Sequence, residues 1–223
     1  MSSFKKTGTV IIKHANPSGA SINNSALKSF EESFKCDPIS AFGGIVVCNY
    51  KINEKIAKKM SEIFFEVIVA KSFNGKAIEI FNKKKNVTLI DASSFKNNKN
   101  EKIKFFDNSF LLQENNNEIA RYNNLKFVTK LRPTIKELKS AEFALNICKY
   151  VKSNSIVISN NFSTIGIGAG QPSRVDSCKI ATQKANKFQP KKLKNSVAAS
   201  DAFFPFPDGC LLYTSPSPRD TNP

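Results

Sequence analysis

Residues 10–19 read Val10-Ile11-Ile12-Lys13-His14-Ala15-Asn16-Pro17-Ser18-Gly19. The three apolar residues at the start predict a buried strand, and the segment from Asn16 to Gly19 predicts the turn that ends it. Lys13 and His14 therefore fall where a strand meets a loop, a common position for catalytic side chains. His14 is the one histidine of the chain, so it is the candidate for any histidine acid or base. The alternative is a hydrogen-bonded structural histidine.

Composition and cysteine usage bound the class of protein. The chain has 223 residues, 40% of them hydrophobic, so it can bury a core as one large domain or two small ones. The sequence contains neither an apolar run of membrane-spanning length nor a signal-peptide core, so we expect a cytoplasmic protein without a membrane partner. Five scattered cysteines argue against a disulfide framework and a structural zinc site: Cys36, Cys48, Cys148, Cys178 and Cys210.

The formal net charge of +16 favours a polyanionic partner. The lysines are dispersed among asparagines, however, and do not alternate with aromatic residues as in a single-strand binder. We therefore rank a lysine-rich solvated surface first, attraction of anionic small molecules second, and a basic nucleic-acid-binding module third.

Hydrophobic periodicity predicts alternating helices and strands. Helices are expected over residues 25–35, 53–65, 77–81, 134–151 and 174–188, and strands over 45–48, 67–70, 87–90, 110–112 and 156–158. Asn53 should cap the second helix, and Thr134 with Glu137 should form a capping box at the fourth. This alternation predicts an α/β sheet covered by helices, and the polar stretch over residues 93–108 predicts an exposed crossing between two halves.

A glycine-rich segment over residues 166–170 invites a dinucleotide-binding interpretation. The fingerprint requires its third glycine at position 171, where this chain has Gln171. The match to the dinucleotide fingerprint is therefore weak.

Four separated segments occur in the order found in one protein family. They are Lys13-His14-Ala15-Asn16-Pro17, then Asp37-Pro38-Ile39-Ser40-Ala41-Phe42-Gly43-Gly44, then Lys152-Ser153-Asn154-Ser155 with the segment Ile165 to Arg174, and Ser200-Asp201-Ala202-Phe203-Phe204-Pro205-Phe206. Through them the chain, from Val10 to Asp208, resembles the transformylase part of the bifunctional phosphoribosylaminoimidazolecarboxamide (AICAR) formyltransferase/IMP cyclohydrolase family. Four segments in one order are highly specific, whereas any one alone would not be.

The resemblance implies an α/β fold of cytidine-deaminase-like mixed sheets with flanking helices, built as two related units. We expect the first unit over residues 1–112 and the second, incomplete, over residues 113–209. Residues 210–223 lose the lysine and asparagine background, so we expect a foreign tail on a truncated gene, with a natural proline-serine linker as the alternative. The resemblance also implies a homodimer with its active site across the interface.

Site positions follow from the resemblance, residue by residue. His14 is implied as the general base and Lys13 as its catalytic partner. The implied substrate-binding residues are Gly43, Glu66, Asn154, Arg174 and Phe203. The resemblance also implies that residues 166–170 form a close-approach loop, which delivers Arg174 to the nucleotide phosphate at the start of the following helix. Val175 and Asp208 are implied on the folate side, where Pro207 replaces an arginine of the relatives and alters the setting of Asp208.

The implied reaction transfers a formyl group from the cosubstrate 10-formyltetrahydrofolate to the exocyclic amine of AICAR in purine biosynthesis. No metal ligand is implied among the site residues, although some relatives bind a monovalent cation. The cyclohydrolase part is absent from this sequence, so we expect the chain alone to be inactive or nearly so. The alternatives are a basic nucleic-acid-binding module and a non-functional gene fragment; a zinc deaminase would require a Pro-Cys-x-x-Cys signature, which the sequence lacks.

Overall fold

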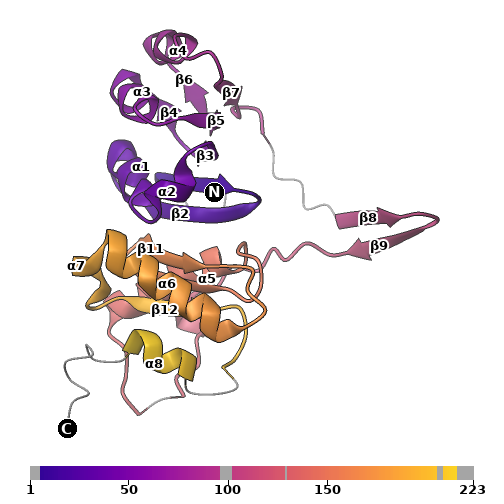
Figure 1. Ribbon diagram of the computed structural model, residues 1–223, viewed down its shortest axis with the longest axis vertical. Helices are drawn as coiled ribbons and strands as arrows, with labels where there is room; N and C mark the ends of the chain where they lie inside the picture. Colours follow the sequence, from indigo (N-terminus) through magenta and orange to yellow (C-terminus); the bar gives the residue numbers. More distant parts are fainter. Residues whose placement is uncertain (1–5, 96–101, 129, 205–207, 215–223) are drawn as a thin grey trace.

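The computed structural model describes residues 6–95, 102–128, 130–204 and 208–214, and these form an α/β protein (Figure 1). Its helices are α1 (Ala26–Phe34), α2 (Pro38–Ala41), α3 (Glu54–Ser61), α4 (Gly75–Asn82), the 3-10 turn η1 (Tyr122–Asn124), α5 (Ile135–Cys148), α6 (Arg174–Phe188), α7 (Pro190–Leu193) and α8 (Asp208–Thr214). Its strands are β1 (Gly8–Lys13), β2 (Asn16–Ile22), β3 (Gly44–Cys48), β4 (Lys51–Ile52), β5 (Phe65–Ala70), β6 (Ser72–Phe73), β7 (Thr88–Asp91), β8 (Lys102–Phe106), β9 (Ser109–Gln113), β10 (Ile156–Asn160), β11 (Ser163–Gly168) and β12 (Val197–Ser200).

One mixed sheet runs through both halves of the chain. Its strand order is β12-β10-β11-β2-β1-β3-β5-β7, in which β3, β5 and β7 are parallel and the other neighbours are antiparallel. The halves meet where β2 pairs with β11, through Ser21 opposite Ser163. Side chains extend this junction, because Ala20 N donates to Thr164 Oγ1 (2.9 Å) and the hydroxyls of Ser21 and Ser163 lie 2.8 Å apart.

The same order of elements occurs twice along the sheet. In the first half the hairpin β1–β2 is followed by α1 and then by β3, which pairs antiparallel with β1. In the second half the hairpin β10–β11 is followed by α6 and then by β12, which pairs antiparallel with β10. The predicted α/β class, with a mixed sheet, flanking helices and two related units, is confirmed. The predicted boundary between residues 112 and 113 stays a prediction.

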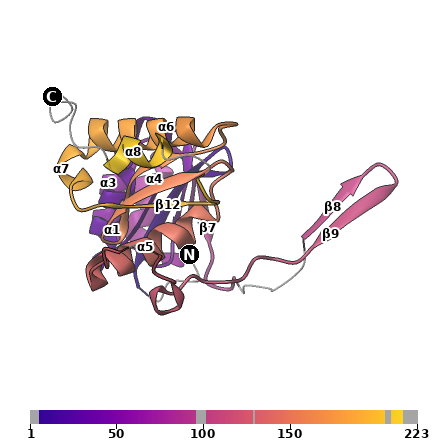
Figure 2. The same ribbon diagram turned by 90° about the horizontal axis from the view of Figure 1, so that it is seen from below.

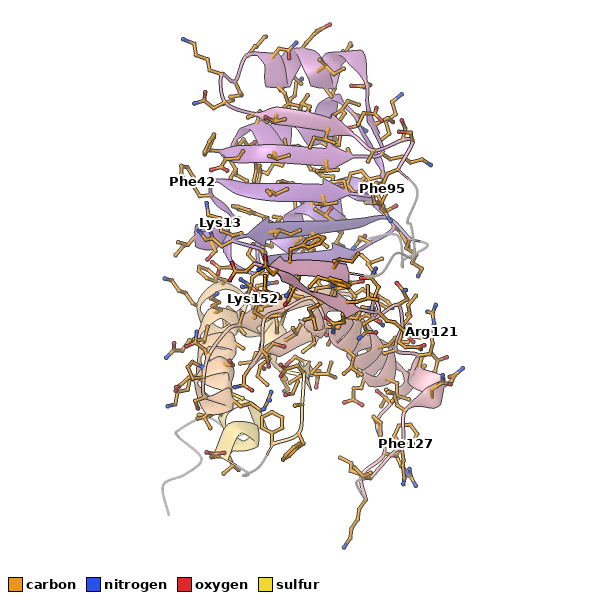
Figure 3. All side chains as sticks on the ribbon, turned by 90° about the vertical axis from the view of Figure 1, so that its right-hand side faces the viewer. Lys13, Phe42, Phe95, Arg121, Phe127 and Lys152 are labelled. Atoms are coloured by element: carbon orange, nitrogen blue, oxygen red, sulfur yellow. The ribbon has the colours of Figure 1, made fainter. Side chains whose placement is uncertain are left out.

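Helices cover the two halves differently. In the second half Val157 packs in the core that contains the α5 residue Phe143, whereas Ile156 and Ile158 pack with Ala181 of α6, so both faces of the sheet are covered. In the first half α1, α3 and α4 cover one face. The other face carries Val47, Val67 and Val69, all partly exposed, and Ile45, which is 37% exposed. Figure 3 looks onto this open face, with the strands in front of the helices.

Local signals placed most helices correctly. The side chain of Asn53 accepts a hydrogen bond from Ile56 N and begins α3, and Thr134 with Glu137 forms the capping box of α5, as predicted. The predicted helix over residues 174–188 matches the bounds of α6. The side-chain oxygen of a cap residue satisfies a backbone N–H that the first helical turn leaves unpaired.

The glycine-rich segment is mainly a strand and not the predicted loop. Gly166 and Gly168 lie in β11, where a Cβ would fall 2.1 Å from Ala181 O and 1.9 Å from Ser177 O. These glycines therefore let α6 pack directly on the strand, and the prediction of a ligand loop at their positions is wrong. The chain leaves the strand after Gly168, and Gly170 has a φ of +67°.

The crossing between the halves contains the hairpin β8–β9. Figures 1 and 2 both show this hairpin standing away from the body of the molecule. Its apolar side chains are exposed, among them Phe105 at 79% and Phe110 at 64%. Within the described residues no helix is long and apolar enough to cross a membrane.

Candidate functional site

The first part of the site is the tip of the β1–β2 hairpin. Lys13 pairs with Asn16, so the turn consists of His14 and Ala15, whose φ angles are +49° and +61°. Two left-handed residues are the pattern of a two-residue turn that matches the twist of the strands. The predicted turn at residues 16–19 is wrong, because these residues begin β2. Ile11 and Ile12 lie opposite Gly19 and Pro17, so Ser18 is a bulged residue of β2, directly after Pro17.

Lys13 is fixed at the end of β1 by the chain that enters β3. Its Nζ donates hydrogen bonds to Phe42 O (2.9 Å) and Gly43 O (2.8 Å). Gly43 has a φ of +64°, and a Cβ there would lie 2.8 Å from Lys13 Nζ and 3.6 Å from Glu66 Oε1. The structure therefore brings Lys13, Gly43 and Glu66 together, and the missing side chain of Gly43 leaves room beside the ammonium group.

The second part of the site is the loop that enters β10. Lys152 N donates to Asn16 Oδ1 (2.9 Å), which joins this loop to the β1–β2 hairpin. Asn154 follows a cis peptide bond, and its Nδ2 donates to Gln171 O (3.0 Å) and Pro172 O (2.8 Å). The loop is thus fixed against both the first half and the segment before α6.

Arg174, the first residue of α6, is the centre of a polar cluster. Its Nη2 donates to Asn154 Oδ1 (2.6 Å), and its Nη1 donates to Ser200 Oγ (2.7 Å) and to Asp201 Oδ1. The guanidinium group also lies 5.9 Å from the centre of the Phe204 ring. Asn154 and Arg174, predicted from separate segments, are therefore in direct contact.

Asp201 joins the same cluster. Ser153 Oγ donates to Asp201 Oδ2, and Ser155 N donates to Asp201 Oδ1 (3.1 Å). Burial raises the pKa of this carboxyl, but the hydrogen bonds from Ser153, Arg174 and Ser155 outweigh burial, so the pKa of Asp201 lies below its ordinary value. Asp201 is thus an anion held against the guanidinium group.

Sheet topology places both parts at one edge. The end of β1 and the starts of β3, β5 and β10 all lie on this side of the sheet, together with the ends of β11 and β12. Figure 3 shows Lys13, Phe42 and Lys152 along this edge and Phe95 at the opposite one. The site residues come from both halves of the chain.

The other three predicted site residues are Val175, Phe203 and Asp208. Val175 is the second residue of α6 and is partly buried. Phe203 is 81% exposed, and Asp208 is the exposed first residue of α8, where its Oδ1 accepts from Gly209 N (2.8 Å). Pro207 lies outside the described residues, so its predicted effect on Asp208 stays a prediction.

Asp201 and Ser200 were not predicted as site residues. Both lie at the end of β12, whose short run of small residues over 197–200 was not predicted as a strand. A polar pair directly after an extended segment is the signal that would have indicated them. Asn16 was also missed, because it was interpreted as part of a turn.

The cysteines form no metal site among the residues that the structure describes. Cys36, Cys48, Cys148 and Cys178 are buried thiols, and burial raises the pKa of Cys36 and Cys48 to about 12. Within the described ranges no group of three or more His, Cys, Asp and Glu side chains comes together.

Fold and site together define an α/β protein whose sheet has a polar edge built from two related halves. The edge offers an ammonium group, an imidazole, a carboxamide and a guanidinium group, a set suited to an anion that carries a polar ring.

Comparison with known proteins agrees with this class. The family model of the AICARFT/IMPCHase bienzyme matches residues 1–184. The bifunctional purine biosynthesis protein PurH of Fusobacterium nucleatum is 39% identical over 208 residues, which cover 93% of this chain and 40% of that protein. PurH of Buchnera aphidicola subsp. Acyrthosiphon pisum is 42% identical (92% and 39% covered), and PurH of Persephonella marina is 43% identical (92% and 40% covered). The chain belongs to the AICARFT/IMPCHase bienzyme family, and it spans about 40% of the length of these relatives.

Proposed function

We propose that this chain acts in purine biosynthesis and provides the AICAR-binding and acid-base part of a formyltransferase. The carrying observation is the single edge at which the hydrogen bond between Lys152 and Asn16 joins the Lys13–His14 tip to the Asn154–Arg174 cluster. Both groups carry residues that the family resemblance assigns to substrate binding or catalysis.

The chemistry of formyl transfer matches these side chains. The exocyclic amine of AICAR is conjugated with its ring, so it is a poor nucleophile until it loses a proton. In the proposed step the amine nitrogen attacks the formyl carbon, His14 takes the proton, and the Lys13 ammonium group stabilises the oxyanion. The bond from the carbon to N10 of the folate then breaks, and the His14 imidazolium returns its proton to that nitrogen as it leaves. Asn154 orients AICAR, and Arg174 holds its phosphate.

The folate side of the proposal rests on Val175 and Asp208, and Phe203 belongs to the AICAR side. Val175 directly follows Arg174 in α6, whereas Phe203 and Asp208 follow β12, and the exposed Phe203 ring provides an apolar surface of the kind that binds a flat heterocycle. The cosubstrate is 10-formyltetrahydrofolate. A monovalent cation stays part of the proposal without an assigned residue.

We further propose a cytoplasmic homodimer. The open face of β3 and β5 and the projecting β8–β9 hairpin support a second copy, because both expose apolar side chains. On the hairpin, the pairs Ile103 with Leu112 and Phe105 with Phe110 lie on one face, and each of these four residues is at least 50% exposed. A lone two-stranded hairpin is marginally stable in water, so an apolar face of this kind favours a partner.

Isothermal titration calorimetry with AICAR tests the proposed function. The riboside of AICAR, which lacks the phosphate, is the matched control ligand. We expect AICAR to bind more tightly than the riboside, and we expect Asn154→Ala to weaken AICAR binding about tenfold or more. AICAR binding no tighter than that of the riboside would contradict the proposal.

The same titration method distinguishes the proposed function from the alternative of a basic nucleic-acid-binding module. A basic nucleic-acid-binding module would bind a single-stranded oligonucleotide with an affinity that falls steeply with salt, and AICAR would not compete. The proposed function predicts that AICAR still binds in an excess of oligonucleotide.

A further inference from the structure

The two halves of the sheet correspond to each other residue by residue. In each hairpin one residue of the second strand is bulged where the pairing register shifts, Ser18 in β2 and Ile165 in β11. The glycine after each bulged residue packs directly under a helix. A Cβ at Gly19 would fall 1.9 Å from a backbone oxygen of α1, and one at Gly166 would fall 2.1 Å from a backbone oxygen of α6. Therefore β1, β2 and α1 correspond to β10, β11 and α6.

The third strand of each half ends in the same way. Asn49 directly follows β3, and its Oδ1 accepts a hydrogen bond from Gly8 N (2.8 Å). Asp201 directly follows β12, and its Oδ1 accepts a hydrogen bond from Ser155 N (3.1 Å). Each of these two residues also donates its backbone N–H to the backbone oxygen of the same partner, at 3.3 Å and 3.4 Å. Therefore β3 corresponds to β12.

The second half has a helix for which the described part of the first half shows no counterpart. This helix, α5, precedes β10 and lies on the face of the sheet opposite α6. Its residues Phe143 and Ala144 share a core with Val157 of β10 and Ala199 of β12. The helix α5 therefore covers the pair of strands that corresponds to β1 and β3.

The corresponding face of β1 and β3 carries apolar side chains with no described helix over them (Figure 3). Val10 and Ile12 of β1 lie opposite Val47 and Ile45 of β3. Val10, Ile12 and Val47 are partly exposed, and Ile45 is 37% exposed. Val10 also packs against the core beneath α5, so these side chains continue a core that is already formed. We call these four β-branched side chains the β1–β3 surface, and a surface of this kind is covered by a helix in most α/β sheets.

We propose that the β1–β3 surface is the docking surface of an amphipathic α-helix that precedes β1 in the longer protein and corresponds to α5. The repeat identifies this occupant, because α5 comes from the segment directly ahead of the hairpin whose strands it covers. This chain spans about 40% of the length of its relatives, so proteins of this family have further chain that can supply the helix. The helix should present apolar residues at spacings of three and four, as α5 does with Phe143, Ala144 and Ile147.

One helix covers the β1–β3 surface and little more of the sheet. An α-helix with its side chains is about 10 Å wide and neighbouring strands lie about 4.8 Å apart, so a helix covers about two strands. Val67 and Val69 of β5 therefore stay open beside it, and with the β8–β9 hairpin they remain for the second copy proposed above. This inference does not rest on the proposed function, because no ligand takes part in it.

The first test supplies a helix from a relative. The probe is the segment of about 30 residues that directly precedes the matched region in PurH of Persephonella marina, attached ahead of the first matched residue of this chain. Hydrogen exchange followed by mass spectrometry measures the protection of the added segment. We expect its amides to exchange at least about tenfold more slowly than those of the same segment as a free peptide.

A second extended chain carries the corresponding segment of PurH of Buchnera aphidicola subsp. Acyrthosiphon pisum. It excludes a mismatch that is particular to one relative. Exchange as fast as in the free peptides in both extended chains would overturn the inference.

Two variants of the extended chain test where the helix docks. Ile45→Lys places a charge within the β1–β3 surface, and Val69→Lys, the matched control, places the same charge on β5 beyond the helix. We expect the added segment to lose its protection in Ile45→Lys and to keep it in Val69→Lys. Val47→Thr is a milder change of the same surface and should reduce the protection, and unchanged exchange of β10 and β11 verifies that each variant is folded. Equal protection in the wild type, Ile45→Lys and Val47→Thr would overturn the inference.

Sedimentation velocity of the chain without an extension distinguishes the helix from a second copy on this surface. The proposal predicts that the wild type and Ile45→Lys sediment alike, because the second copy is held by β5 and the β8–β9 hairpin. A dimer for the wild type and a monomer for Ile45→Lys would assign the β1–β3 surface to the second copy and overturn the inference.

Discussion

The backbone amide of Lys152 donates a 2.9 Å hydrogen bond to the side-chain oxygen of Asn16. These residues come from different halves of the chain, two positions from His14 and two positions from Asn154 respectively. The bond therefore fixes the tip that carries the proposed base against the loop that carries a proposed substrate ligand. One site can be built from the two halves only if this junction holds them together.

Asn16→Ala should weaken that junction. The Lys152 amide would lose its acceptor, which costs about 1 kcal/mol of unfolding free energy, measurable by urea denaturation. Asn16→Asp is the matched control, because its carboxylate keeps an acceptor at nearly the same place. If both variants were equally stable, the hydrogen bond would not be a significant link between the halves.

Two lysines of the second half pair with carboxylates of the first, and this predicts a pH dependence. Lys184 Nζ lies 2.8 Å from Asp37 Oδ2, and Lys192 pairs with Glu32. Burial raises the pKa of both carboxyls, but hydrogen bonds and the lysine charges outweigh burial, so both pKa values lie below the ordinary 3.8 and 4.5. A lowered folded-state pKa stabilises the fold above the unfolded pKa, and this contribution is lost as the pH falls through the folded pKa.

The unfolding free energy should therefore stay nearly constant from about pH 7 to pH 5 and fall below about pH 4. Asp37→Asn should lower the unfolding free energy by about 2–4 kcal/mol at pH 7, because Lys184 loses its partner. The decrease of the unfolding free energy below pH 4 should also be less steep in this variant. Glu79→Gln, in an exposed position on α4, is the control. If the unfolding free energy of Asp37→Asn fell below pH 4 as steeply as that of the wild type, Asp37 would be excluded as the source of the decrease.

The contact between β11 and α6 predicts that Gly168→Ala is severely destabilising. Its Cβ would fall 1.9 Å from the backbone oxygen of Ser177, so the helix would have to move away from the strand. We expect a loss of about 3 kcal/mol or more in a urea titration. Gly75→Ala is the control, because nothing lies within 4 Å of the Cβ built there. Similar losses in both variants would contradict the packing argument.

Gly43 offers a test of the space beside Lys13. Gly43→Ala and Gly170→Ala both place alanine at a left-handed φ, +64° and +67°, so both should lose about 1 kcal/mol of stability. In Gly43→Ala the new methyl group would also lie 2.8 Å from Lys13 Nζ. AICAR titrations should therefore show the larger loss of affinity for Gly43→Ala. The reverse order would remove Gly43 and Lys13 from the nucleotide site.

The β8–β9 hairpin predicts how the chain associates. Phe105→Ser disrupts the face that carries four apolar residues, whereas Lys104→Ser, the control, lies on the opposite face opposite Leu111. Sedimentation velocity should show a dimer for the wild type and Lys104→Ser and a shift toward monomer for Phe105→Ser. Identical sedimentation of all three chains would indicate that this face does not hold the dimer.

Local signals and long-range contacts differed in how far sequence could predict them. The bounds of α6 and the caps at Asn53 and Thr134 depend on neighbouring residues, and they were predicted correctly. The turn at His14 and Ala15 was placed wrongly, because Pro17 and Gly19 are typical of turns and the bulge that accepts Pro17 depends on pairing with β1. The contact of Arg174 with Asp201 required β12, which its small residues did not indicate.

A crystal structure of this chain with AICAR tests the central claim most directly. We expect the nucleotide at the Lys13–Lys152 edge of the sheet, with its phosphate at Arg174 and its exocyclic amine near His14. A nucleotide bound elsewhere, or with its phosphate away from Arg174 and its amine away from His14, would contradict it.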